Sequence, residues 1–437
     1  MSPEPVRRLS DEDLSILALE SETVAGHTCK VILLDERIDV TLLRASIASR
    51  LDRALPLRLR LAEVDGELWW ESDPELDLDA HVVVDDDSEP LDAAGLRGAV
   101  AEAFRRRLDR SRPLWRIELV PRLADGGSAL IWSFHHAVAD GSTMMDVAQA
   151  ALWDAAPSGD GKSSRRSPAK PPKARPDRGG APRVSRVPLT GVRVAAREVP
   201  NLWQRSPFDG HVDAQRSVAL VSVPLDAMRQ AARATDGATV NDAILTVVAG
   251  GLRGWLELHN GHLGSVRVKV PVSLHGIATA ENGASEAGNR DSFFCLDLPL
   301  NPADPLARLR AVRRATRVRK ESHDAQQLDA FMRRLGRVPQ LRRFADRVLT
   351  GPRSFAVNVS NVRGPEPPVR VLGATVTGLY SLAEIREHHA LRIAVVSLGE
   401  RLNFGLTADP TLLRDVDQLA DQIRADADAL VARVQYV

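Results

Sequence analysis

The stretch SALIWSFHHAVADG, residues 128–141, carries the signal that decides the fold. The continuous apolar run from Ser128 to Phe134 is typical of a β-strand that is buried on both of its faces. Helical periodicity begins a few residues later, with apolar side chains at Met144, Met145, Ala148, Ala151 and Leu152. We therefore expect a buried strand, a turn and a helix, with two histidines at the point where the strand ends.

Segments further along the chain show the same mixture of strands and helices. The residues from Thr239 to Asp242 match a capping box, which predicts the start of an amphipathic helix. Strands are predicted at 266–272 and 354–359. The chain closes on a predicted helix whose apolar stripe is Val416, Leu419, Ala420, Ile423, Ala427 and Leu430. Together these patterns predict an α/β protein with two lobes.

A break in composition divides the two halves. Residues 156–187, APSGDGKSSRRSPAKPPKARPDRGGAPRVSRV, are rich in Pro, Gly, Ser and Arg and have no hydrophobic periodicity. Such a segment cannot offset its ordering entropy by burial, so we expect a flexible linker, although its basic excess could also contact anionic lipid. The expected organisation is an N-terminal lobe at 1–155, the linker at 156–187 and a C-terminal lobe at 188–437.

The charge balance and the cysteines exclude several classes of protein. The 437 residues include 58 Lys and Arg against 58 Asp and Glu, which disfavours a nucleic-acid binder because such proteins need a positive field. Cys29 and Cys295 are too far apart in the sequence to suggest a disulfide scaffold or a zinc module. No apolar run approaches the ~20 residues that span a bilayer. We expect a cytoplasmic protein whose membrane contact, if any, is peripheral.

The two histidines at the end of the strand are the candidates for chemistry. Neighbouring side chains on a strand point to opposite faces, so His135 and His136 are not expected to hold one metal ion together. One of them would face a cleft as a general base, with Asp140 as the acceptor that orients its ring. The alternative is a buried structural pair, with Asp140 and Ser142 initiating the helix and Gly141 allowing the turn.

The segment HHAVADG resembles the HHxxxDG motif of the acyl-CoA-dependent acyltransferase superfamily, which includes chloramphenicol acetyltransferase and nonribosomal peptide condensation domains. From about Leu9 to the C-terminus, the chain resembles the bacterial wax ester synthase/diacylglycerol acyltransferases within it. The short motifs that carry this resemblance are, in order, Pro113-Leu114-Trp115, Asn241-Asp242, Pro271-Val272-Ser273, Gly288-Asn289 and Ser360-Asn361-Val362 with Gly364-Pro365. Each motif alone is weak, and the ordered set is specific.

The resemblance implies a two-lobed chloramphenicol acetyltransferase-like fold with a substrate tunnel between the lobes. It implies that His136 is the general base that takes a proton from an acceptor hydroxyl, which then attacks the acyl-CoA thioester. His135 would pack beside it, while Asp140 and Gly141 would hold the loop. The residues Asn241, Asp242, Ser360 and Asn361 would line the substrate channel. No cofactor or metal is implied, because acyl-CoA is a co-substrate and the acceptor is diacylglycerol or a long-chain alcohol.

Some positions depart from the family pattern and keep alternatives open. Relatives commonly carry an Arg after the PVS strand, where it could pair with the motif aspartate, but this chain has Leu274-His275. A condensation-type acyltransferase fed by a carrier protein, or a catalytically idle lipid-binding protein of the same fold, are the alternative functions. Asp242 is also explained by its capping role alone, and Ser360-Asn361 could form an ordinary turn.

Three further features have simpler interpretations. Trp115 and Trp132 are expected in the core, and His388-His389 is expected to be a surface pair. The stretch 306–348 is unusually basic, with apolar residues at roughly helical spacing, and a basic amphipathic helix can lie in a membrane interface. The alternative is a pair of core-packing helices with solvated Arg faces. Peripheral association with a membrane or a lipid droplet is therefore a hypothesis.

Overall fold

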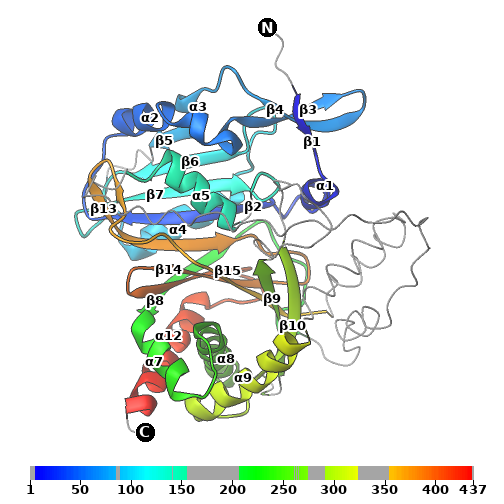
Figure 1. The fold of residues 1–437 in the computed structure, drawn as a ribbon, viewed down its shortest axis with the longest axis vertical. Helices are drawn as coiled ribbons and strands as arrows, with labels where there is room; N and C mark the ends of the chain where they lie inside the picture. Colours follow the sequence, from blue (N-terminus) through cyan, green and yellow to red (C-terminus); the bar gives the residue numbers. More distant parts are fainter. Residues whose placement is uncertain are drawn as a thin grey trace, which may run out of the picture.

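Two six-stranded sheets with helices packed on them form the body of the computed structural model (Figure 1). The structure describes residues 5–84, 89–139, 141–154, 206–259, 261, 263, 265–273, 291–322 and 354–435. The expected linker at 156–187 lies outside these residues. The predicted mixed α/β architecture with two lobes is confirmed.

The first sheet has the strand order β12-β13-β2-β7-β6-β5. Its strands are β12 (Arg370–Val371), β13 (Ala374–Ala383), β2 (His27–Leu34), β7 (Ser128–His135), β6 (Trp115–Val120) and β5 (Val82–Val84). The helices of this lobe are α2 (Val40–Ala48), α3 (Leu78–His81), α4 (Ala93–Arg105) and α5 (Gly141–Ala151). The predicted strand is β7, which pairs with β2 and β6, and the predicted helix is α5.

Strand β7 is buried on both faces because helices pack on each side of it. All of its residues are buried. Leu130, Trp132 and Phe134 share a core cluster with apolar residues of α2 and α5. Ala129 and Ile131, on the other face, share a cluster with apolar residues of α4. The alternation of side chains therefore predicts His135 on the α4 face, which is where the structure places it.

A small antiparallel sheet extends from the first lobe. Its strand order is β1-β4-β3. The elements of this region are β1 (Pro5–Arg8), α1 (Asp11–Leu17), the 3₁₀ helices η1 (Leu51–Arg53) and η2 (Leu55–Arg58), β3 (Leu59–Val64) and β4 (Glu67–Ser72). Trp70 is fully buried here, and its indole N–H donates to the carboxylate of Asp13 over 3.1 Å. This bond fixes α1 against β4, close to the segment that leads to residue 20.

The second sheet has the strand order β10-β9-β11-β14-β15-β8, and helices gather on one side of it (Figure 1). Its strands are β8 (Ser217–Pro224), β9 (Ser265–Ser273), β10 (Asp291–Pro299), β11 (Val357–Val362), β14 (Leu391–Leu398) and β15 (Arg401–Ala408). The helices are α7 (Leu225–Ala234), α8 (Val240–Leu258), α9 (Pro305–Glu321) and α12 (Val416–Gln435). The predicted capping box between Thr239 and Asp242 opens α8, and the predicted apolar stripe of α12 is buried.

The lobes do not divide cleanly at the predicted linker. Strand β13, from the second half of the sequence, pairs with β2 and so belongs to the first sheet. The chain then passes through the 384–390 connection into β14 of the second sheet. A Cβ on Gly405 of β15 would lie only 2.2 Å from the carbonyl oxygen of Ser381 in β13, so a glycine is needed where these strands approach each other. Residues 370–383, which lie within the C-terminal lobe expected at 188–437, thus supply two strands of the first sheet.

Helix α9 covers the first part of the basic stretch, and its apolar side faces the protein core. Leu306, Leu309 and Val312 belong to the core cluster of the second lobe. Arg308 is also buried and forms an ion pair with Asp426 of α12. Residues 323–348 lie outside the described parts of the chain. Among the residues that are described, no helix combines the length and apolar character needed to cross a membrane.

Candidate functional site

His135 is the last residue of β7, and its ring is held between an acidic side chain and the backbone of its own loop. Its Nε2 lies 2.8 Å from Oε1 of Glu20, which belongs to the segment between α1 and β2. Its Nδ1 accepts a hydrogen bond from the N–H of Ala137 over 3.1 Å. An acceptor nitrogen carries no proton, so the proton of the neutral ring is on Nε2, which lies next to the Glu20 carboxylate. The tautomer of His135 is thus determined by its two partners.

The Glu20 carboxylate is prepared to act as that partner. Burial alone would raise the pKa of Glu20, but its contacts with His135 and Arg110 together hold this pKa below its ordinary value. Arg110 Nη2 lies 2.9 Å from the carboxylate, and Arg107 Nη1 lies 3.4 Å from it. An ionised Glu20 therefore accepts from His135 at neutral pH.

The backbone around the two histidines is anchored from both sides. The N–H of His135 donates to the carbonyl of Leu114 over 2.9 Å, so the Pro-Leu-Trp motif supports the end of β7. The N–H of His136 donates to the carbonyl of Gly26 over 3.3 Å. Gly26 has a φ of +73°, and a Cβ there would lie 2.7 Å from Nε2 of His135 and 2.8 Å from Cγ of Glu20. Only glycine fits this position, since both the backbone angle and the space exclude a side chain.

A second histidine, His27 of β2, lies directly opposite His135 in the strand pair. It is fully buried, stacks on Phe104 with ring centroids 5.3 Å apart, and has Nε2 3.2 Å from the carbonyl of Ala103. Burial lowers the pKa of His27 to about 4. His27 is therefore neutral at physiological pH and packs in the core next to His135.

His136 follows β7 and differs from His135 in exposure. His135 is only 1% exposed, whereas His136 is half-buried, so part of His136 is accessible to solvent. This is the division that strand alternation predicts, with one ring packed behind and the other facing outward. The backbone of His136 is fixed by its hydrogen bond to Gly26 and by the neighbouring hydrogen bond from Ala137 to His135. The structure therefore fixes the backbone that carries a half-buried histidine at the end of β7.

The second lobe meets this region at the start of α5. A Cβ built on Gly141 would lie 3.4 Å from Cγ2 of Val362, at the end of β11. Two of the predicted motifs, HHAVADG and Ser360-Asn361-Val362, are thus brought into contact. In addition, the side-chain amide of Asn361 donates to Oδ1 of Asn241 over 3.5 Å. Asn241, Ser360 and Asn361 therefore lie together on the second-lobe side.

Asp242, by contrast, is fully used in holding the helices of the second lobe. It is 1% exposed, and its carboxylate accepts from the N–H and the hydroxyl of Thr239, each over 2.8 Å. It also accepts from the hydroxyl of Thr316 in α9 over 2.6 Å. These contacts favour the capping interpretation over a position in the substrate channel. Asp140, His275, Gly288 and Asn289 lie outside the described residues.

Lys30 is a buried cation that the sequence motifs do not include. It is 1% exposed on β2, and its Nζ donates to the hydroxyl of Ser381 in β13 over 2.8 Å. The same Nζ lies 4.0 Å from where a Cβ on Gly141 would be. A positive charge is therefore placed beside the first turn of α5. No pattern in the sequence points to Lys30, Glu20 or Gly26, because only the folded chain brings β2 and its preceding segment next to β7.

Comparison with known proteins identifies two family models that cover most of the chain. The model described as the wax ester synthase/diacylglycerol acyltransferase catalytic domain matches residues 9–244. The model described as the WS/DGAT C-terminal domain matches residues 287–430.

Individual relatives agree with these models. The chain is 30% identical over 471 residues to a protein of Mycobacterium tuberculosis named as a diacylglycerol O-acyltransferase, covering 98% of this chain and 97% of the relative. A protein of the same designation in Mycobacterium bovis is 31% identical over 398 residues, covering 84% of this chain and 77% of the relative. The solved wax ester synthase/diacylglycerol acyltransferase of Marinobacter aquaeolei VT8 has the same fold, with a TM-score of 0.69, 21% identity, and coverage of 98% of this chain and 100% of that one.

Proposed function

Because the chain belongs to the wax ester synthase/diacylglycerol acyltransferase family, we propose that it transfers a long-chain acyl group from acyl-CoA to diacylglycerol or a long-chain alcohol. The product is triacylglycerol or a wax ester. Neither a carrier-protein-dependent condensation reaction nor an idle lipid-binding role is favoured, since the family models and the relatives all point to O-acyltransferases.

In the proposed mechanism, His136 acts as the general base. Its imidazole takes the proton of the acceptor hydroxyl while the oxygen attacks the thioester carbonyl carbon. The tetrahedral intermediate then collapses, the carbon–sulfur bond breaks, and the CoA thiolate leaves with the proton returned by the His136 imidazolium. General-base assistance of this kind contributes roughly 10²–10⁴ in rate. No covalent acyl-enzyme is needed.

The observation that carries this assignment is the fixed loop at the end of β7. Glu20 orients His135, and His135 Nδ1 in turn accepts from the N–H of Ala137, the residue after His136. The Gly26 carbonyl holds the N–H of His136 itself. A base whose backbone is held on both sides keeps one position toward its substrate, which is what proximity catalysis requires. His135 and Glu20 are positioning residues in this proposal, and Asp140 and Gly141 are proposed to hold the loop.

The acceptors dissolve in lipid, so peripheral contact with a membrane or a lipid-droplet surface belongs to the proposal. Helix α9 gives it no support, because its apolar side packs in the core and Arg308 pairs with Asp426. The substrate tunnel between the lobes likewise stays a prediction.

The proposal is tested by identifying the product. Purified protein is incubated with palmitoyl-CoA and either hexadecanol or dioleoylglycerol, and lipid products are separated and identified by mass spectrometry. We expect palmityl palmitate, triacylglycerol or both, with one CoA released per ester formed. CoA release without any ester in the presence of either acceptor would contradict acyl transfer to these lipids.

A further inference from the structure

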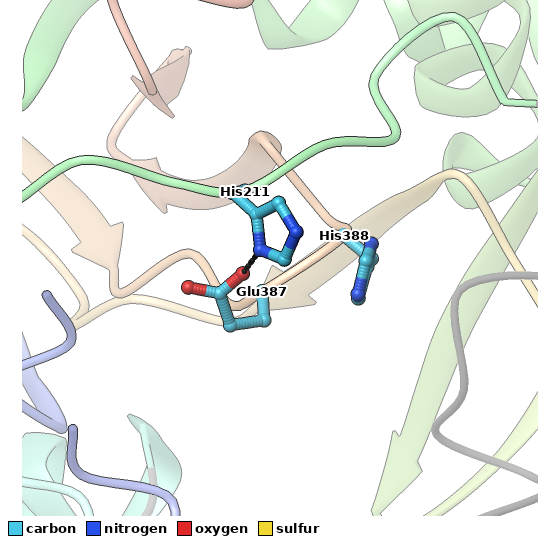
Figure 2. A group of neighbouring side chains, drawn as sticks. All are labelled: His211, Glu387 and His388. Carbon is cyan, nitrogen blue, oxygen red and sulfur yellow. Dashed lines mark hydrogen bonds and ion pairs between the residues drawn. The ribbon is translucent and has the colours of Figure 1, made fainter.

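A cluster of metal-ligating side chains lies away from the proposed catalytic histidine, where the segment 206–213 meets the connection between β13 and β14. His211 comes from the first segment, and Glu387 and His388 come from the second (Figure 2). One ligand atom from each residue can be chosen so that all three lie within 4.8 Å of one another. Figure 2 shows the His211 ring directed at the Glu387 carboxylate, with Nδ1 3.2 Å from Oε2.

The donor set suits a zinc ion. Two imidazoles and one carboxylate, with a water in the fourth position, form a common Zn²⁺ coordination shell, with metal–ligand distances of about 2.0–2.2 Å. Tetrahedral angles at those distances put neighbouring ligand atoms roughly 3.3 Å apart, and the His211–Glu387 pair already has that spacing. The His211 side chain is 91% exposed, so its ring is free to turn and solvent can complete the shell.

A carboxylate behind the ring of His388 orients this ring for coordination of a metal ion. Its Nδ1 lies 2.8 Å from Oδ1 of Asp209. This bond holds the proton on Nδ1 and leaves the lone pair of Nε2 available to a metal, which is the carboxylate–histidine arrangement found behind zinc-binding histidines. The prediction that His388 and His389 form a surface pair is wrong for His389, because His389 is buried and stacked on Phe355, with ring centroids 4.1 Å apart.

Backbone hydrogen bonds already join the two segments that carry the cluster, so binding of a metal ion would not need to bring distant segments together. The N–H of His388 donates to the carbonyl of Gly210 over 2.9 Å, and the N–H of Ala390 donates to the carbonyl of Phe208 over 3.0 Å. Glu387 also accepts from the hydroxyl of Thr23 in the first lobe over 3.3 Å. Preorganisation of this kind lowers the entropy cost of assembling a site.

We propose that His211, Glu387 and His388 bind one Zn²⁺ ion, with Asp209 orienting His388. The ion would replace the proton that now joins His211 to Glu387 and would link the segment 206–213 to the β13–β14 connection. Through Thr23 it would also fix the segment that leads from Glu20 toward β2. This site is separate from His136, so it stands or falls independently of the proposed acyl transfer.

The test is a zinc titration of the full chain, prepared without a histidine tag and in buffer free of chelators and thiols. Calorimetry should give one saturable equivalent of zinc for the wild type and none for His211→Ala or His388→Ala. Asp209→Asn should weaken affinity by roughly 10–100-fold without abolishing it, as removal of such a partner does elsewhere. Cobalt added in place of zinc should give the visible absorption bands of a four-coordinate site in the wild type but not in His211→Ala or His388→Ala.

A matched control is His259→Ala. His259 also lies near a carboxylate, with Nε2 3.6 Å from Asp415, but it is not in the cluster. This variant should bind zinc as the wild type does. Thermal unfolding in EDTA should be unchanged for all variants, because His211 and His388 are exposed enough for their loss to be tolerated. Absence of saturable binding to the wild type, or binding that persists in the His211→Ala/His388→Ala double variant, would overturn the proposal.

Discussion

Replacing Glu20 by Gln tests whether the acidic partner of His135 contributes to catalysis at the adjacent His136. Gln has nearly the same shape as Glu and can still accept a hydrogen bond, so the substitution removes the charge and leaves the packing. In the structure, Glu20 Oε1 lies 2.8 Å from His135 Nε2, and the His135 ring is 2% exposed on its side-chain atoms. The bond is therefore charge-assisted and shielded from water.

The size of the effect follows from that geometry. A hydrogen bond to a charged group contributes about 1.5–3 kcal/mol net. A neutral Gln acceptor keeps about 0.5–1.5 kcal/mol of this contribution. If the orientation of the 135–137 loop matters fully in the transition state, losing the remaining ~1–1.5 kcal/mol lowers kcat by roughly 5–12-fold, since ~1.4 kcal/mol corresponds to a factor of ten. KM should change little, because Glu20 is proposed to act on the base and not on the bound acyl-CoA.

The assay is CoA release under saturating acyl-CoA and acceptor, with kcat and KM determined separately. Glu102→Gln provides a matched control, because Glu102 forms an exposed ion pair with Arg105 of α4, with 49% of its side chain accessible. Exposed pairs of this kind contribute little, so this variant should behave as the wild type. A Glu20→Gln variant that is folded and keeps wild-type kcat would refute the positioning role of Glu20.

Further substitutions probe the surroundings of the site and the second lobe. Gly26→Ala should lower the free energy of unfolding in urea by at least ~1–2 kcal/mol, because a side chain at φ +73° is strained and its Cβ meets His135; an unchanged midpoint would contradict this. The pKa of His27 is lowered to about 4, so the folded state resists its protonation and stability should be lost as pH falls from about 6.5 to 4. This contribution is at most ~3 kcal/mol, and His27→Gln should flatten the pH dependence of the urea midpoint; a parallel curve would exclude it. Asp426→Ala should cost about 3–5 kcal/mol in the same measurement because it leaves the buried Arg308 unpaired, whereas pairing it with Arg308→Met should recover much of the loss.

The sequence could predict the elements whose signals are local. The apolar run of β7 shows burial on both faces, the Thr239–Asp242 pair opens α8, and the stripe of α12 faces the core. Strand alternation also separates His135 from His136 correctly. Each of these follows from the period of side chains along one element, which is written in the sequence itself.

Other parts of the site depend on contacts between distant segments, which no local pattern contains. Glu20 reaches His135 across more than a hundred residues, and Lys30 meets Ser381 only because β13 crosses back to the first sheet. The predicted strand at 354–359 is displaced to Val357–Val362, since β11 takes its register from β14.

The most direct test of the general-base role of His136 compares wild-type protein with His136→Ala in the acceptor-dependent release of CoA from palmitoyl-CoA. The rate should fall by roughly 10²–10⁴ in the variant, for whichever of hexadecanol or dioleoylglycerol the wild type uses, while the thermal unfolding midpoint stays close to that of the wild type. His259→Ala, at the C-terminal end of α8, should retain the rate of acyl transfer. A His136→Ala variant that releases CoA and forms ester at the wild-type rate would contradict the assignment of His136 as the general base.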